Sequence, residues 1–202
     1  MSSNLKKFIA LAATACLIGV AYYGTWLPLQ KSQAYVAGLQ GRRAIKSWDD
    51  FTSAFTPALA KVSPIGQEEL VKNFGSLVQS LLGLNSQSRP EVAEAVLKYY
   101  GQFMDPLVAR GHGLSYGQTI YVAAAVQQTA FEATGGERFA KAAEQLYRRG
   151  LEYSPHRPQY LYGLLKIYVK SNRREEAKRI AEEILSFWPT DNDVRKALEE
   201  LQ

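Results

Sequence analysis

The chain has 202 residues, of which 47% are hydrophobic and 21% charged, the balance of an ordinary folded protein. Its net charge of +5 comes from 24 basic and 19 acidic residues that form no basic block, so we expect no nucleic-acid partner. With Cys16 as the single cysteine and two histidines, His112 and His156, an intrachain disulfide is excluded and a zinc site lacks ligands. We therefore expect no metal and no cofactor.

The first residues predict a membrane anchor over residues 1–29. Residues 8–29 carry no charge, and 22 residues at about 1.5 Å each reach roughly 33 Å, enough to cross a bilayer core of about 30 Å. Tyr22, Tyr23 and Trp26 cluster at the far end, where aromatic rings favour the membrane–water interface. A cleaved signal peptide or a lipoprotein modified at Cys16 are the alternatives.

The distribution of charge does not decide the orientation of this anchor. Basic residues flank both ends of the span, namely Lys6, Lys7, Lys31, Arg42, Arg43 and Lys46. A single N-terminal anchor more often leaves its N-terminus in the cytoplasm. We expect a single-pass membrane protein with its soluble part on the extracytoplasmic side.

Residues 30–113 read as a helical region. Ser47 followed by Asp50 predicts a capping box. The apolar residues at helical spacing after it are Trp48, Phe51, Phe55 and Leu59. A second amphipathic helix is expected from Gln67, and a third from Pro90, with Ser88 and Glu91 as its cap and its end near Asp105–Pro106.

A turn and a long helix follow. The stretch with Gly111, Gly113 and Gly117 predicts a turn between helices rather than a phosphate-binding loop. The alanine-rich run after it is closed by Gly135–Gly136. No segment alternates with a period of two, so the fold class is all-α: an N-terminal transmembrane helix followed by an array of α-helical hairpins.

The C-terminal part contains a repeat. Pro155 and Pro189 each close a helix-like run and lie 34 residues apart. Residues 156–189 thus form one unit. Its first helix has an inner face of Leu161, Leu164, Leu165 and Tyr168, Asn172 occupies the turn, and its second helix carries Ala177, Ala181 and Ile184. The preceding residues repeat the same order with Ala143, Tyr147 and Gly150.

This pattern resembles the tetratricopeptide repeat, a helix pair with small and aromatic residues at fixed places and a closing proline. The resemblance covers residues 156–189 and the second helix of the unit before, whereas Gly135–Gly136 come too early for that unit's first helix. It implies a repeat domain over residues 114–202, ending in a capping helix with Asp191 as its N-cap.

A looser resemblance covers more of the chain. The order of a hydrophobic span, a helix with alanines, the stretch "FTPALAKVSPIGQEELV" and then repeats looks like the C-terminal tail of bacterial O-antigen ligase or polymerase-type membrane proteins. The catalytic part of such enzymes lies in many membrane helices, and this sequence has one. The resemblance implies a detached tail or accessory subunit of a cell-envelope polysaccharide system.

The tetratricopeptide resemblance also implies a concave groove that binds protein partners. Its groove positions in the intact repeat are Gln159, Tyr162, Lys166, Val169 and Lys170. Lys166 and Lys170 are four residues apart, so both ammonium groups can meet an acidic segment, or they are simply the solvated side of a helix.

The sequence offers no nucleophile–base pair and no paired carboxylates in a pocket, so we expect no enzyme and no catalytic residues. We expect a membrane-anchored scaffold for protein–protein interaction, its partner a protein that can itself be an integral membrane protein. The alternative is the polysaccharide accessory subunit.

Overall fold

The computed structural model describes residues 3–84, 90–113 and 115–201. Every regular element in these ranges is a helix, which confirms the all-α class. The chain divides into two compact units, Met1–Val71 and Lys72–Gln202, with the boundary inside helix α4 (Gln67–Leu84). The predicted capping residue Ser88 lies outside the described residues. The three-part division at residues 29 and 113 stays a prediction.

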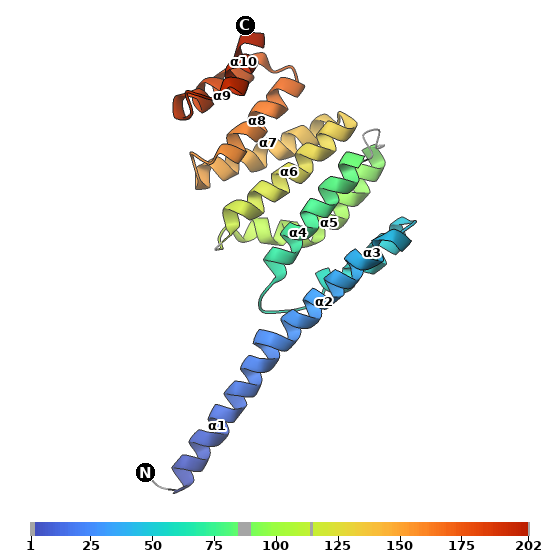
Figure 1. Cartoon of the computed structure of the whole chain (residues 1–202), viewed down its shortest axis with the longest axis vertical. Helices are drawn as coiled ribbons and strands as arrows, with labels where there is room; N and C mark the ends of the chain where they lie inside the picture. The colour runs from blue at the N-terminus through green and yellow to red at the C-terminus, as the bar shows by residue number, and fades with distance from the viewer. Residues whose placement is uncertain (1–2, 85–89, 114, 202) are drawn as a thin grey trace. The chain divides into compact units, whose positions relative to one another are not determined.

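The first unit begins with one long rod made of α1 (Ser3–Ala21), η1 (Tyr22–Trp26) and α2 (Leu27–Gln40), shown in Figure 1. Pro28 explains the π turn η1 in its middle. A proline cannot donate to the carbonyl four residues earlier, and its ring clashes with that carbonyl. The helix widens there instead, and the backbone N–H of Leu27 donates to the carbonyl of Tyr22.

The rod contains one candidate membrane span. Among the described residues, the helix Ser3–Ala44, which includes the short η2 (Gly41–Ala44), is long and apolar enough to cross a bilayer. Its most apolar window has a mean hydropathy of 1.7, and no residue of that window is buried. This finding rests on length and composition.

Helix α3 (Trp48–Leu59) folds back along α2. The predicted capping box is confirmed: the Asp50 N–H donates to Ser47 Oγ at 3.1 Å and the Ser47 N–H donates to Asp50 Oδ2 at 3.0 Å. Phe51, Phe55 and Leu59 are buried as expected, but Trp48 is 40% exposed because it lies at the first residue of the helix.

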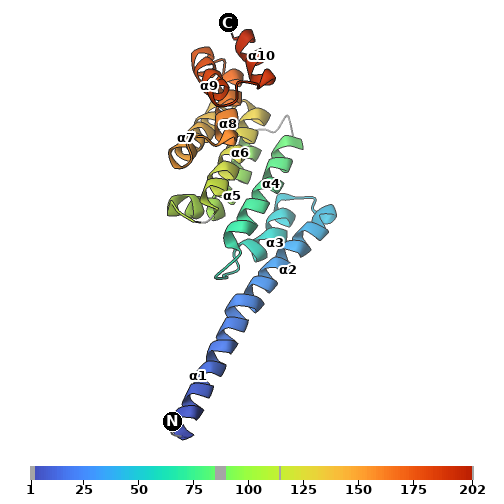
Figure 2. The same cartoon turned by 60° about the vertical axis from the view of Figure 1, so that its left-hand side comes forward.

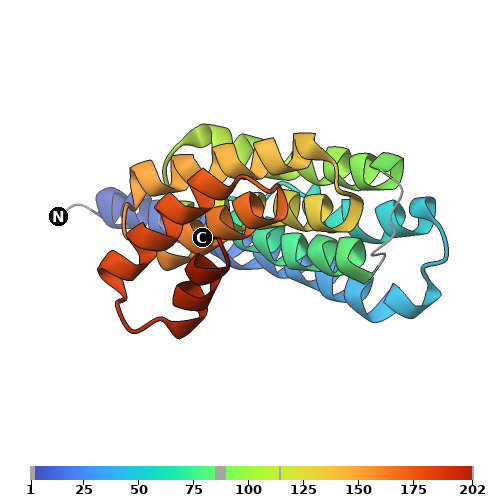
Figure 3. The same cartoon turned by 90° about the horizontal axis from the view of Figure 1, so that it is seen from above.

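The second unit holds the rest of α4 and the helices α5 (Pro90–Arg110), α6 (Tyr116–Thr134), α7 (Glu137–Tyr153), α8 (Pro158–Lys170), α9 (Arg174–Phe187) and α10 (Asn192–Glu200). Consecutive helices pair as hairpins that stack along the array (Figure 2). Seen from above, α5 and α7 lie on one side and α4 and α6 on the other (Figure 3).

One predicted boundary was wrong. Helix α5 does not end at Asp105–Pro106 but continues to Arg110, with Pro106 inside it. Leu107 and Val108 beyond the proline are both buried. Their burial outweighs the one backbone hydrogen bond that a proline removes from a helix.

The turns between the helices lie where the sequence predicts them. Gly111 and Gly113 have φ of 75° and 144°, and Gly135 ends α6 with φ of 69°, all in the region that favours glycine. Asn172, between α8 and α9, has φ of 55°, as expected for a residue that tolerates left-handed geometry. Asp191 caps α10, since its Oδ1 accepts from the Val194 N–H at 3.0 Å, which confirms the predicted cap.

Two glycines allow α7 and α8 to pack closely. A Cβ on Gly150 would lie 2.6 Å from the ring of Tyr160, and a Cβ on Gly163 would overlap the ring of Tyr147. Both tyrosines are fully buried. Each of the two helices thus packs a tyrosine ring onto a glycine of the other helix, and these contacts join α8 to α7.

Candidate partner-binding groove

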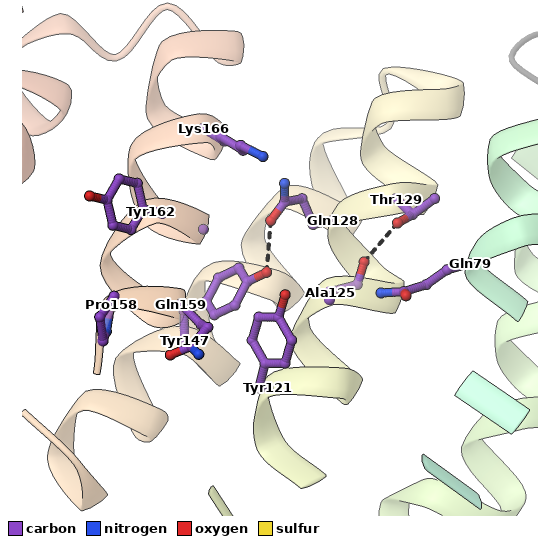
Figure 4. A pocket seen from close by; sticks show the side chains of 11 residues that line it. Gln79, Tyr121, Ala125, Gln128, Thr129, Tyr147, Pro158, Gln159, Tyr162 and Lys166 are labelled. Atoms are coloured by element: carbon purple, nitrogen blue, oxygen red, sulfur yellow. Dashed lines mark hydrogen bonds between the residues drawn. The ribbon is translucent and has the colours of Figure 1, made fainter. Parts of the chain in front are cut away.

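The second unit contains a cavity of about 430 Å³ that opens between α4, α6 and α8, with Tyr147 of α7 at its base (Figure 4). Its polar side chains are Gln79, Tyr121, Gln128, Thr129, Gln159, Tyr162 and Lys166. Three carboxamides and the phenol groups both donate and accept hydrogen bonds, and one ammonium group adds positive charge. We call this cavity the groove.

The base of the groove is held in place by hydrogen bonds. The Tyr147 hydroxyl donates to Gln128 Oε1 at 2.7 Å, and Thr129 Oγ1 donates to the carbonyl of Ala125 at 2.9 Å (Figure 4). Burial, with smaller effects of Tyr121 and Glu132, raises the pKa of Tyr147 far above that of a free tyrosine. Tyr147 is therefore a neutral donor that fixes the carbonyl end of Gln128, while Gln128 Nε2 donates to Glu132 Oε1 at 2.6 Å.

Tyr162 is oriented from the other side. Its hydroxyl donates to Asp191 Oδ2, the second oxygen of the carboxylate that caps α10. The hydrogen bond to Asp191, then burial and the charges of Asp191 and Asp193, raise the pKa of Tyr162 to about 12. The capping helix thus positions a groove side chain as well as closing the array.

Of the five residues predicted from the repeat, the structure places three in the lining of the groove. Gln159, Tyr162 and Lys166 line the groove, and Lys166 points over it toward α6 in Figure 4. Val169 is 48% exposed. Lys170 Nζ instead donates to the carbonyl of Glu132 at 2.8 Å, at the C-terminal end of α6.

Lys166 and Lys170 therefore do not both line the groove. The carbonyl ends of a helix carry partial negative charge, which favours a cation such as Lys170 there. The ring of Phe131, 5.7 Å from the ammonium group, adds a cation–π contact. Lys166 is left as the positive charge that lines the groove.

Besides Tyr147, five groove residues lie outside the repeat unit 156–189. Gln79 comes from α4, and Tyr121, Ala125, Gln128 and Thr129 come from α6. A signal was available for the α6 residues, because positions 121, 125, 128 and 129 lie on one helical face. No feature of the sequence places Gln79 opposite them.

A cluster of charges lies between α7, α8 and α9. Glu144 accepts hydrogen bonds from Arg173 Nη1 at 2.5 Å, from the Tyr168 hydroxyl at 2.8 Å and from Arg148 Nε at 3.0 Å. Burial alone would raise the pKa of Glu144, but these hydrogen bonds outweigh it, so that its pKa lies below the ordinary value. This cluster joins the two hairpins whose first helices form the groove wall.

Glu144→Gln is expected to lower the free energy of unfolding by about 1–2 kcal/mol at pH 7, toward the lower end because Arg173 is 37% exposed and solvent screens the pair. A depressed carboxyl pKa stabilises the fold above the unfolded-state value, and this stabilisation is lost as the pH falls through the folded-state value. The difference between wild type and variant should therefore shrink in acid. Denaturant unfolding between pH 7 and pH 3 measures it, with the exposed Glu182→Gln as control. A loss that is the same at all pH values would contradict this reading.

Within the described ranges, no three His, Cys, Asp or Glu side chains gather in a way that suits a metal ion. The groove has neither a nucleophile paired with a base nor paired carboxylates among its described residues. Beside the ammonium group of Lys166 it offers neutral donors and acceptors, which suit the N–H and C=O groups of an extended peptide.

A family model matches the C-terminal part of the chain. The family model described as "Tetratricopeptide repeat" matches residues 137–201, which include α7, α8, α9 and α10. Helix α6 lies outside this match, in line with the early Gly135–Gly136. No curated protein and no solved structure matches the chain. Residues 137–201 are thus similar to the tetratricopeptide repeat family, whose members generally mediate protein–protein interactions and are not catalytic.

Proposed function

We propose that this chain is a membrane-anchored, non-catalytic scaffold that holds a protein partner in the groove, close to the bilayer. The observation that carries the proposal is the groove itself: α4, α6 and α8 bring carboxamides, phenol groups and one ammonium group around a cavity large enough for several residues of a peptide. The tetratricopeptide family match supports a protein as the ligand.

The anchor is proposed from the first unit. Leu11, Leu17, Ile18 and Val20 are between 65% and 71% exposed, so this helix has no core to pack into within the part of the chain that the structure describes. A long apolar helix without such a core is stabilised by lipid. The same helix continues into α2, which packs against α3, and this continuity supports an uncleaved anchor over a signal peptide.

The membrane face is proposed from charge, and the class of partner from confinement to a membrane. We place the N-terminus in the cytoplasm and the soluble part on the extracytoplasmic side, with Lys6 and Lys7 as the cytoplasmic charges. Confinement to a membrane raises the effective concentration of a partner in the same membrane, which favours an integral membrane protein. None of the comparisons supports the resemblance to O-antigen ligase tails, and a role in polysaccharide assembly stays a prediction.

Charge reversal at Lys166 tests the groove. Peptides selected from a random library on the full chain in nanodiscs should be enriched in acidic residues, and Lys166→Glu should weaken their binding about tenfold, or about 1.4 kcal/mol. The exposed Lys98→Glu on α5 makes the same change of charge and should leave the affinity unchanged. Equal losses in both variants would show that net charge, and not the groove, attracts the peptides.

A further inference from the structure

The connection between α3 and α4 exposes apolar side chains. Val62 is 85% exposed and Ile65 is 55% exposed, with Pro64 next to Ile65. Single exposed apolar residues are common on soluble proteins. These are gathered in one turn of irregular chain, residues 60–66, which we call the apolar loop.

The apolar loop has a defined position in the first unit. The buried Lys31 of α2 donates from Nζ to the carbonyl of Lys61. Ser63 Oγ donates to the carbonyl of Ile65 at 2.8 Å, and Gln67 Nε2 donates to the carbonyl of Leu59 at 3.2 Å. Contacts on both sides thus fix the loop where its apolar side chains point outward.

The loop lies beside the candidate membrane span. Pro64 and Ile65 line one apolar depression of about 500 Å³ together with Val20, Tyr23 and Gly24 of the rod. Val20 precedes Leu29, the last residue of the predicted span, by nine residues, or roughly 14 Å along a helix. The loop therefore lies beside turns of the rod that belong to residues 8–29. If these residues span the bilayer, lipid surrounds those turns.

We propose that residues 62–65 insert into the bilayer beside the anchor and that lipid acyl chains fill the depression between them. This inference rests on the membrane anchor of the proposed function. Val62 and Ile65 then give the first unit a second contact with the bilayer. Because this unit also contains α2 and α3, that contact limits how the unit can tilt on its single helix.

Nitroxide labels on single cysteines test the insertion, because Cys16 is the only cysteine of the chain. In a Cys16→Ala background, Val62→Cys and Ile65→Cys are labelled in the full chain, which is then reconstituted in phosphatidylcholine–phosphatidylglycerol vesicles. Asp49→Cys is the control, since Asp49 is exposed in the first turn of α3, about 15 Å along the helix from Leu59. Electron paramagnetic resonance compares collision with oxygen, which concentrates in lipid, and with a nickel chelate, which stays in water.

The labels at 62 and 65 should collide several-fold more with oxygen than with the chelate, and the label at 49 the reverse. Chelate accessibility at 62 and 65 equal to that at 49 would overturn the inference, and so would shielding from both reagents, which indicates protein cover. The unsubstituted chain labelled at Cys16 separates the two claims. If the label at Cys16 collides mainly with oxygen while the labels at 62 and 65 collide mainly with the chelate, the insertion alone is refuted. If the label at Cys16 itself collides mainly with the chelate, the anchor is refuted.

Discussion

Gly163→Ala is expected to lower the free energy of unfolding of the repeat unit by about 1–3 kcal/mol, the usual cost of forcing extra volume into a packed interior. The new Cβ would overlap the ring of Tyr147, which is fully buried and holds Gln128 through its hydroxyl. The ring cannot move away without breaking that hydrogen bond, so α7 and α8 must separate. The better helix propensity of alanine, worth up to about 1 kcal/mol, offsets only part of this cost.

Thermal and denaturant unfolding of the full chain in detergent, followed by circular dichroism, measures the effect. Gly83→Ala in α4 is the matched control, since nothing lies within 4 Å of its added Cβ. That variant should be as stable as the wild type or slightly more stable. If both variants unfold alike, the close approach of α7 and α8 at Gly163 is refuted.

Leu17→Arg is expected to release the protein from the membrane. Leu17 is 70% exposed and lies in the middle of residues 8–29. Exchange of leucine for arginine at the centre of a span costs about 3–4 kcal/mol of insertion free energy. Extraction of membranes at alkaline pH, which removes peripheral proteins, should therefore leave the wild type in the pellet and move much of the variant to the supernatant.

Val36→Arg controls for the added charge, because Val36 lies on the same rod beyond the span and is 44% exposed. This variant should stay in the pellet. Retention of Leu17→Arg at the wild-type level would contradict the anchor. A mass corresponding to loss of the first residues would favour the signal-peptide alternative.

The sequence predicted the features that depend on neighbours in the chain. The capping box at Ser47 and Asp50, the cap at Asp191 and the left-handed Asn172 all follow from chemistry within a few residues, and the structure confirms each of them. The inner face of α8 was predicted equally well, since helical spacing identifies it.

Predictions that depended on distant neighbours succeeded less often. The predicted end of α5 was wrong because the burial of Leu107 and Val108 outweighs the helix-ending effect of Pro106. The direction of Lys170 is set by the end of α6, 38 residues away in the chain, which no local pattern reports. For the same reason Gln79 of α4 was missed as part of the groove. The roles of Gln159, Tyr162 and Lys166 in binding, the membrane orientation and the partner stay predictions.

Site-specific photo-cross-linking in native membranes tests the scaffold function most directly. A photoreactive amino acid replaces Lys166 in the groove, and in a second variant it replaces Glu182, which is exposed on α9 outside the groove. We predict that a defined membrane-associated protein is cross-linked from position 166 and not from position 182, and that a groove-binding acidic peptide in excess abolishes the product. The same products from both positions, or none from position 166, would contradict the account.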